Sequence, residues 1–330
     1  MARQCVSTYL GIDGGGSKTA FLLIDDSGQV LGSHTEGPAY YLQIGWDAMR
    51  AMLARGIQAT LAQAALAPEA LTFAFLGLPA YGEDSRLLAA LDTVASPLLP
   101  AARYRCDCDA VCGWAGALAG ADGINIIAGT GSMAYGQYQG RAARAGGWGE
   151  LFSDEGSAYW IARQGLTLFS RMSDGRAARG PLYEILRAHF KLQSDLDLCA
   201  AIYDQAQVQR SHLAALAPLM AQAARAGDAS ASALFVDAAD ELVRMVDAVR
   251  SQLEVASQTT LTVSYSGGLF QQRDLLLPQL QAQLATGNRR YRLAAPRLSP
   301  VAGAALYAAQ QSGAPLPAAA INSLQANLGV

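Results

Sequence analysis

Charge is scarce in this chain, and neither sign dominates. Charged residues make up 15% of the 330 residues, and 24 basic against 27 acidic side chains leave a net charge of −3. A chain without a basic excess has no electrostatic footprint for nucleic acid or for an anionic membrane. With 52% hydrophobic residues, it also lacks the composition of a disordered protein. We therefore expect a folded protein whose partners are small molecules, with no nucleic acid and no membrane among them.

Cysteine is also scarce, and long apolar runs are missing. Three of the five cysteines, Cys106, Cys108 and Cys112, fall within seven residues, an odd and clustered set that is no disulfide framework. Their C-x-C-x3-C spacing lacks the paired spacing of a zinc ribbon, and no His lies near, so structural thiols are favoured over a metal site. Asp13 and several glycines interrupt the apolar residues after Met1, so no secretory signal is predicted. The default expectation is a cytoplasmic protein.

Two similar halves are visible in the pattern of strands, helices and turns, and the length itself suggests two domains. The first half predicts strands and helices in the order βββαβαβ, over residues 6–12, 20–24, 30–35, 46–65, 71–79, 83–95 and 104–108. The second predicts three strands, a helical region, a strand and a last helix, over residues 123–128, 133–137, 141–145, 155–257, 261–266 and 300–310.

This repeated opening predicts an α/β protein of two duplicated lobes, residues 1–120 and 121–330. The second lobe would carry a helical insertion, and helix 300–310 is available to pack back on the first lobe. Residues 298–330 carry no charged side chain, and Pro315 and Pro317 predict a non-helical tail after the last helix.

Each half places a glycine-rich turn between its first two strands. The turns read IDGGGSKT at 12–19 and IAGTGSMA at 127–134. Glycine lets an anion approach main-chain N–H groups closely, while hydroxyls and a lysine add further donors. Either turn alone would be read as an ordinary hairpin, but the pair favours phosphate binding. The candidate phosphate contacts are Gly15, Gly16, Ser17, Lys18 and Thr19 in the first turn and Gly129, Thr130, Gly131 and Ser132 in the second.

Two familiar nucleotide motifs do not fit these turns. The sequence has no GxxxxGK[ST], so a P-loop is excluded. A predicted strand follows GGGSKT, whereas the dinucleotide-binding fingerprint runs into a helix. Two hairpins, one per lobe, that hold a triphosphate between them remain the interpretation.

The sequence resembles the N-acetylglucosamine kinase branch of the BadF/BadG-type ATPase family, within the actin/hexokinase/Hsp70-like fold. The motifs that carry the resemblance are DGGGSKT at 13–19, GTGS at 129–132, GGWGELFSDEGSAYWIAR at 146–163, SGGLF at 266–270 and LSPVAGAAL at 298–306. The resemblance spans roughly residues 9–310, and its most specific part is the motif at 146–163. It implies two actin-like (ribonuclease H-like) lobes with a cleft between them, and ATP with Mg²⁺ as cofactors.

The resemblance also assigns roles to residues. It implies that Asp13 holds Mg²⁺ through water, because Mg²⁺ usually keeps several waters. It implies that Gly147, Trp148, Gly149 and Asp154 contact a sugar, and that Gly227, Gly267 and Gly268 contact adenosine. From the residues alone, Ser153-Asp154-Glu155 reads as the charged opening of a helix, Trp148 could equally belong to the core, and Gly227 could be a plain helix C-cap.

Two carboxylates, Asp107 and Asp109, end the strand at 104–108 and are candidates for the general base that phosphoryl transfer to a hydroxyl requires. Asp109 precedes a predicted helix over 110–121, so from the residues alone it is a base or a helix cap in equal measure. The resemblance selects Asp109, which stands 20 residues before the first glycine of the second turn.

One position departs from the family. Where relatives carry an Asn after the turn that follows strand three, this chain has Tyr40 and Tyr41. A phenol can donate to and accept from a sugar hydroxyl, so Tyr40 is a predicted substrate contact. The alternative is that both rings pack between strand three and helix 46–65.

The resulting hypothesis is transfer of the γ-phosphoryl group of ATP to an amino sugar, giving N-acetylglucosamine 6-phosphate from N-acetylglucosamine, by a homodimer. A glucosamine kinase is the second hypothesis. An ATPase that activates a reductase or dehydratase is an alternative of another class, and a sugar-binding regulator with a degenerate ATP site is a third.

Overall fold

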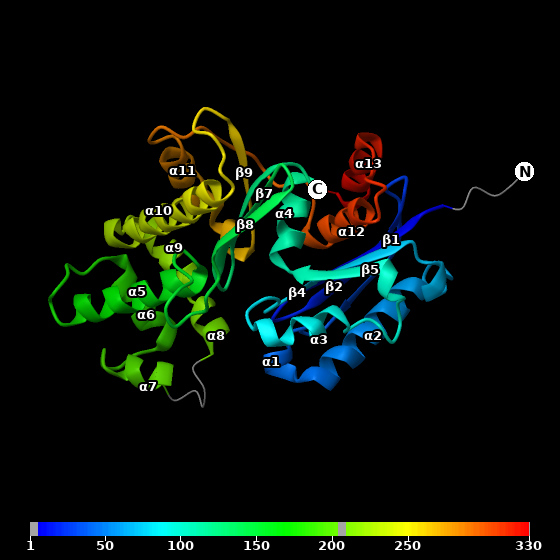
Figure 1. The fold of residues 1–330 in the computed structure, drawn as a ribbon. Coiled ribbons are helices and arrows are strands. Elements are labelled where there is room, and N and C mark those ends of the chain that lie inside the picture. The colour runs from blue at the N-terminus through cyan, green and yellow to red at the C-terminus, as the bar shows by residue number, and fades with distance from the viewer. Residues whose placement is uncertain (1–5, 204–208, 330) are drawn as a thin grey trace, which may run out of the picture. The chain divides into compact units, whose positions relative to one another are not determined.

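The computed structural model describes residues 6–203 and 209–329 and divides into two compact units (Figure 1). The first unit consists of the chain up to Ala121 together with the segment from Ala295 onward, and the second is Asp122–Ala294. Cys5 lies outside the described residues. Each unit has its own five-stranded sheet. None of the helices within the described ranges is both long enough and apolar enough to cross a membrane.

The sheet of the first unit has the strand order β3-β2-β1-β4-β5. β1, β2 and β3 are antiparallel, and β4 and β5 run parallel to β1. Asp13 of β1 lies opposite Gly77 of β4, which lies opposite Asp107 of β5. The C-terminal ends of these three parallel strands therefore meet at one edge of the sheet. The strands are β1 (Thr8–Gly14), β2 (Thr19–Asp25), β3 (Val30–Glu36), β4 (Phe73–Leu78) and β5 (Tyr104–Cys108).

Helices cover this sheet on both faces. The helix α2 (Trp46–Ala62) buries an apolar stripe at spacings of three and four that includes Met49, Leu53 and Ile57. The helices α4 (Ala110–Leu118) and α12 (Pro300–Gln311) pack on each other so closely that a side chain at Gly303 would overlap the backbone at Gly116. The remaining helices are α1 (Tyr41–Ile44), α3 (Leu88–Asp92) and α13 (Ala318–Leu328), with short 3₁₀ turns at Pro68–Ala70, Ser85–Leu87 and Ala101–Arg103.

The sheet of the second unit repeats the first. Its order, β10-β9-β6-β7-β8, matches β5-β4-β1-β2-β3, with the same antiparallel triplet and parallel additions. The strands are β6 (Gly123–Ala128), β7 (Ser132–Tyr138), β8 (Arg141–Gly146), β9 (Leu261–Ser266) and β10 (Tyr291–Leu293). The equal topology of the two sheets confirms the predicted duplicated α/β fold.

A helical layer packs on the second sheet around α10, which contacts β7, β8 and four neighbouring elements of the same unit. Its core includes Phe169, Met220, Phe235, Leu242 and Val246. The helices are α5 (Ala158–Ser173), α6 (Pro181–Phe190), α7 (Asp197–Tyr203), α8 (Arg210–Ala214), α9 (Ala217–Arg225), α10 (Ala229–Gln252) and α11 (Arg273–Leu284), with a 3₁₀ turn at Gly268–Gln272.

The structure differs from the sequence-based expectations in several elements. The helix expected over 83–95 is a 3₁₀ turn and the five residues of α3, because the Tyr104 hydroxyl donates to the Asp92 carbonyl at 2.9 Å where the helix would continue. The tail expected to be non-helical contains α13, which begins directly after Pro317. Amides at the start of a helix have no acceptor within the helix, so the missing N–H of proline does not prevent a helix there. Residues 295–330 lie in the first unit, whereas the predicted boundary grouped 121–330.

Candidate active site

The first glycine turn is a tight hairpin at the carboxyl end of β1. The Gly15 amide donates to the Lys18 carbonyl oxygen at 3.0 Å, which leaves Gly16, Ser17 and Lys18 exposed at the tip. A side chain at Gly14 would lie 2.8 Å from the Gly77 carbonyl oxygen, so only glycine fits beside β4. The tip therefore presents main-chain N–H groups, a hydroxyl and an ammonium to solvent, which is what an anion site requires.

The hydroxyl of Thr19 forms a hydrogen bond within the protein. It is buried and donates to the Gly37 carbonyl oxygen at 2.8 Å, and the Ala39 amide donates to the Gly15 carbonyl oxygen at 3.0 Å. These two bonds tie the turn before Tyr40 to the glycine hairpin. Thr19 thus supports the loop, while the phosphate contact predicted for it stays a prediction.

Asp13 is half-buried at the base of this hairpin and has an unusual electrostatic environment. Burial and the nearby carboxylate of Asp109 raise the pKa of Asp13 to about 7, against smaller opposing effects of Cys112 and Lys18. Two acidic oxygen ligands at one sheet edge suit Mg²⁺, which is usually held by one or two carboxylates together with phosphates and water. Among residues 6–203 and 209–329, no group of three or more His, Cys, Asp or Glu side chains is placed to hold a metal ion.

Asp107 and Asp109 have different surroundings. The Asp107 carboxylate accepts a hydrogen bond from the Cys108 amide at 2.7 Å, and burial raises its pKa. Asp109 occupies the N-cap position of α4, yet its side chain makes no capping bond. The Cys108 thiol donates to it at 3.4 Å. The reading of Asp109 as a helix cap therefore fails, whereas its role as a base stays a prediction.

The two tyrosines that replace the family's Asn diverge in the structure. Tyr41 is buried and stacks on Trp46 with ring centroids 4.6 Å apart, so it belongs to the core. Tyr40 is half-buried and directly follows Ala39, whose amide bonds the glycine hairpin. The packing alternative thus holds for Tyr41. Tyr40 also packs against the core of the first unit and lies edge-on to Tyr41, but it is only partly buried, so its contact with the substrate stays a prediction.

The second glycine turn, at the carboxyl end of β6, is held by the start of α5. The amides of Ala158 and Tyr159 donate to the carbonyl oxygens of Gly129 and Thr130 at 2.9 and 3.3 Å. The Ser132 hydroxyl is buried and donates to the Glu155 carbonyl oxygen at 2.6 Å, so it supports the turn from within. These bonds fasten the second turn to the start of α5.

Asp154 lies beneath this turn. It does not open a helix as the sequence suggested, because α5 begins at Ala158 with Ser157 as its N-cap and Asp154 has a left-handed φ of 66°. Its side chain is 1% exposed, accepts from the Ser132 amide at 3.3 Å and forms an ion pair with Arg210. Burial raises the pKa of Asp154, and the Arg210 guanidinium counteracts that rise.

The predicted adenosine glycines fall in two places. Gly267 and Gly268 follow β9, parallel to β6, and a side chain at Gly267 would overlap the Ala128 carbonyl beside the second turn. Gly227 has a φ of 88° and donates to the Ala224 carbonyl oxygen at 3.0 Å, which is C-cap geometry at the end of α9. Gly267 and Gly268 thus adjoin the second glycine turn, while Gly227 joins α9 to α10.

A family model for BadF/BadG/BcrA/BcrD ATPases matches residues 10–308, nearly the whole chain. The chain belongs to this ATPase family. It is 27% identical over 312 residues to the N-acetyl-D-glucosamine kinase of Dictyostelium discoideum, covering 91% of this chain and 97% of that protein.

Two further relatives extend the comparison. An N-acetylmuramic acid/N-acetylglucosamine kinase of Clostridium acetobutylicum is 28% identical, over 78% of this chain and 84% of its own length. The crystal structure of a candidate N-acetylglucosamine kinase from Chromobacterium violaceum superposes with a TM-score of 0.71 at 28% identity, over 92% of this chain and 99% of that one. These findings confirm the predicted family and the predicted fold.

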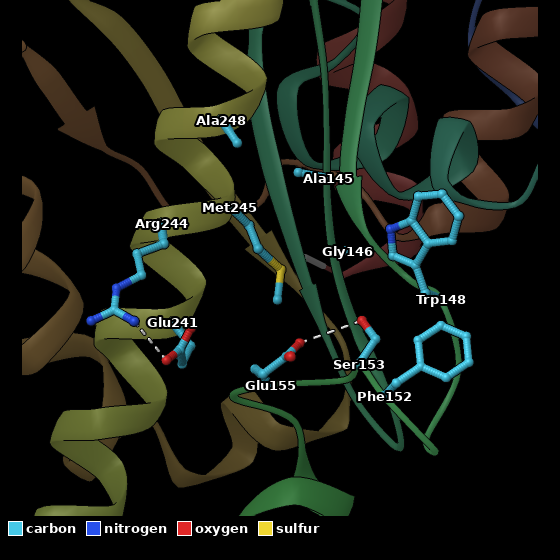
Figure 2. Close-up of a pocket in the computed structure, with 10 residues that line it drawn as sticks. All are labelled: Ala145, Gly146, Trp148, Phe152, Ser153, Glu155, Glu241, Arg244, Met245 and Ala248. Carbon is cyan, nitrogen blue, oxygen red and sulfur yellow. Dashed lines mark hydrogen bonds and ion pairs between the residues drawn. The ribbon is translucent and has the colours of Figure 1, made fainter.

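In this member of the BadF/BadG/BcrA/BcrD family, the segment after β8 is an exposed loop. Gly146, Gly147 and Gly149 all have positive φ, and the Trp148 side chain is 69% exposed, so Trp148 is no core residue. Figure 2 shows Trp148 and Phe152 on one side of a cavity of about 490 Å³, facing Glu241, Arg244 and Met245 of α10. Asp154 is not among the residues that line it.

Sequence reasoning missed two groups at these sites. Cys108 and Cys112 approach Asp109 and the Ile12 carbonyl next to Asp13, and Arg210 reaches Asp154. The clustered cysteines were visible in the sequence, but their place beside the carboxylates follows from the parallel pairing of β1, β4 and β5. Arg210 carries no motif, and only the tertiary fold brings it to the turn.

Proposed function

We propose that this protein is an ATP-dependent amino-sugar kinase that converts N-acetylglucosamine to N-acetylglucosamine 6-phosphate. The observation that carries the proposal is the pair of glycine hairpins at equivalent positions of two topologically equal sheets, with Asp13 and Asp109 at the edge of the first. The two kinases at 27–28% identity support the class of acceptor.

Binding of ATP is assigned to main-chain groups of both hairpins. The exposed tip at Gly16, Ser17 and Lys18 supplies donors and one positive charge, and the second turn supplies donors on a backbone hydrogen-bonded to α5. Gly267 and Gly268 are assigned to adenosine because they lie beside the second turn, where Gly267 packs against the Ala128 backbone and Gly268 has open space at its Cα. Phosphoryl transfer relies mainly on such positioning and charge stabilisation.

Asp109 is proposed as the group that accepts the proton of the sugar hydroxyl. Its carboxylate is not used to cap α4, and it stands near Asp13. Asp13 would hold Mg²⁺ through water, and the charge of that ion would neutralise phosphate oxygens. A divalent cation would also oppose the two effects, burial and the nearby Asp109 carboxylate, that raise the pKa of Asp13.

N-acetylglucosamine is the proposed acceptor, with glucosamine as the second candidate because Tyr40 stands where relatives have an Asn. The loop with Gly147, Trp148 and Gly149 offers an exposed aromatic face for the C–H groups of a pyranose, and we assign Asp154 to its hydroxyls. Activation of a reductase through an iron–sulfur cluster is disfavoured, since Cys106 and Cys112 are buried.

The proposal includes a cytoplasmic homodimer, with ATP as the co-substrate. Light scattering of the purified protein tests the dimer.

The decisive experiment is an ATP-coupled assay over N-acetylglucosamine, glucosamine, N-acetylmannosamine and glucose, with the phosphorylated position of the product identified by NMR. We expect the highest kcat/KM for N-acetylglucosamine and phosphate on O6. Turnover that is equal with and without every sugar would overturn the kinase proposal. A preference for glucosamine would replace the acceptor and leave the reaction class standing.

A further inference from the structure

A cation from a distant part of the second unit lies on the second glycine turn. The turn itself, residues 127–134, contains no Lys or Arg, whereas the first turn carries Lys18. Arg210, the first residue of α8, fills that gap, and α8 packs against α5, whose start holds the turn. A triphosphate bound at this turn would therefore meet one positive side chain.

The position of Arg210 is built by three neighbours. Its Nη2 atom forms an ion pair with Asp154, and its Nε atom lies 3.9 Å from a carboxylate oxygen of Glu150 in the exposed loop after β8. A Cβ at Gly131 would overlap the guanidinium, so the turn admits Arg210 only because residue 131 is glycine. These contacts fix the guanidinium against the main chain of the turn.

The hydrogen bonding of this arrangement is incomplete. Arg210 Nε is buried and makes no hydrogen bond with any of the described residues, whereas Nη2 of the same side chain forms the ion pair with Asp154 Oδ2. The Asp154 side chain is 1% exposed, whereas that of Arg210 is 34% exposed. A guanidinium has five N–H donors in a planar fork, and two carboxylates use only part of them. The accessible part of the fork is suited to a phosphate.

Charge balance gives a second reason. The Asp154 carboxylate accepts from the Ser132 amide, one of the main-chain groups expected to face phosphate. An ionised carboxylate at that point would repel an incoming polyphosphate unless a cation neutralised it. Arg210 is the cation in contact with Asp154, and the other charged group facing this pair is Glu150.

We propose that Arg210 is a nucleotide-binding residue, held by Asp154 and Glu150, whose guanidinium contacts a phosphate of ATP at the second glycine turn. This inference rests on the proposed kinase function. Arg210 makes its contact with the nucleotide, not with the sugar, so its removal changes nucleotide affinity more than sugar affinity.

The test measures the Kd of Mg·ADP and of a non-hydrolysable ATP analogue by calorimetry, together with KM for ATP and for the sugar. The variants are Arg210→Met, Arg210→Gln and Arg210→Lys, with Arg176→Met as a matched control because Arg176 is exposed and its ion-pair partner is Asp174, outside the candidate site. A lost charge-assisted bond corresponds to a roughly 10- to 100-fold weaker Kd. We expect that loss in the Met and Gln variants, partial rescue by Lys, a smaller change in the sugar KM than in the nucleotide Kd, and no change in the control.

The possible outcomes separate the two proposals. Wild-type protein that neither binds nucleotide nor phosphorylates any amino sugar would overturn the proposed function itself. An active wild type with unchanged nucleotide Kd in Arg210→Met would overturn only the role of Arg210. Tighter sugar binding in that variant would also overturn it, because Arg210 would then block Asp154. If Arg210→Met does not fold, Arg210→Gln decides, since its amide can still bond Asp154 without supplying the charge.

Discussion

At the scale of single residues, the two candidate carboxylates at the end of β5 differ in what already binds them. Asp107 accepts the Cys108 amide, while Asp109 is at the N-cap position of α4 without capping it. Asp109 also lies close enough to Asp13 for the two charges to interact. The sequence alone could not separate a capping role from a base, because both roles place an Asp directly before a helix.

We predict that Asp109→Asn lowers kcat by about 10²- to 10⁴-fold, as expected for loss of a general base, with little change in the Kd of ATP or sugar. Asp107→Asn is the matched comparison and should retain most of its turnover, because its carboxylate is bound to the main chain. Steady-state kinetics and calorimetry on both variants check this. If the larger loss appears in Asp107→Asn, the base has been assigned to the wrong residue.

We further predict that Tyr40→Asn alters the ratio of kcat/KM between glucosamine and N-acetylglucosamine, whereas Tyr41→Phe does not. Tyr40 is half-buried next to the first hairpin, and Tyr41 is in the core against Trp46. An amide offers a carbonyl and an NH₂ group where a phenol offers one hydroxyl. If the ratio of the two kcat/KM values stays constant in Tyr40→Asn and Tyr40→Phe, Tyr40 does not determine which sugar is preferred.

At the scale of elements, the strands near the glycine turns were predictable because their signals are local. Apolar runs and glycines alternate over a few residues. β6 has the predicted bounds, and β1, β2 and β7 differ from the prediction by one or two residues at their ends. The helix 83–95 was wrong because the Asp92 carbonyl is taken by Tyr104 from another strand. The ion pair of Arg210 with Asp154 was invisible for the same reason, since no local pattern marks it.

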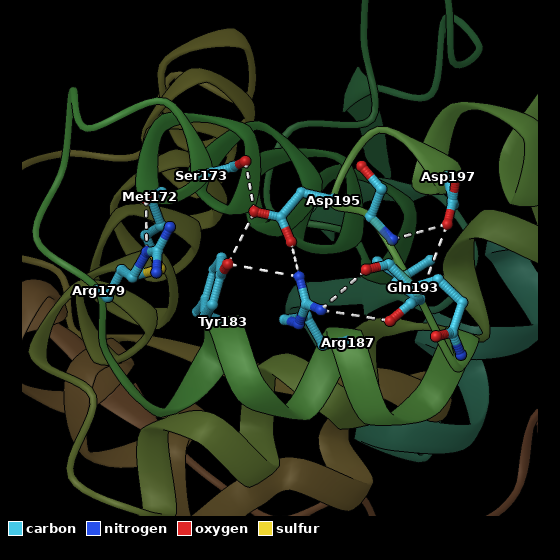
Figure 3. A network of polar contacts seen from close by, with 10 residues as sticks. Met172, Ser173, Arg179, Tyr183, Arg187, Gln193, Asp195 and Asp197 are labelled. Atoms are coloured by element: carbon cyan, nitrogen blue, oxygen red, sulfur yellow. Dashed lines mark hydrogen bonds and ion pairs between the residues drawn. The ribbon is translucent and has the colours of Figure 1, made fainter.

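A side-chain network around Asp195 holds the segment between α6 and α7. Figure 3 shows Asp195 accepting from Ser173 at 2.6 Å and from Tyr183 at 2.7 Å, with an ion pair to Arg187. The Arg179 guanidinium lies over the Tyr183 ring, 4.2 Å from its centroid. The network fastens the segment after α6 to α5 and α6.

We predict that Asp195→Ala lowers the free energy of unfolding by about 2–4 kcal/mol, because it leaves three donors of a partly buried cluster without their acceptor. Asp240→Ala, which removes one exposed ion pair with Arg244 on the surface of α10, should cost less than about 0.5 kcal/mol. Urea unfolding followed by circular dichroism measures both. Equal losses in the two variants would contradict the structural importance of the network.

At the scale of the whole molecule, one unit is a single continuous segment of the chain and the other consists of two segments. The second is one continuous segment, residues 122–294, with its own sheet and core. The first needs the returning segment from Ala295, because α12 packs on β1 and α4 so closely that side chains at Gly11 or Gly303 would overlap its contacts. Each unit also carries one of the two glycine hairpins.

We predict that a fragment of residues 122–294 folds alone and unfolds cooperatively, whereas residues 1–121 alone do not. Without α12, the shorter fragment exposes the buried faces of β1 and α4, which favours aggregation over folding. Joining residues 1–121 to 295–329 through a flexible linker should restore cooperative unfolding, which makes it the matched control. Urea titrations of the three fragments, followed by circular dichroism and light scattering, decide the point. Cooperative unfolding of residues 1–121 alone would show that α12 is dispensable for the first unit. Neither folded fragment should phosphorylate a sugar, since each has one hairpin and the reaction, as proposed, uses both.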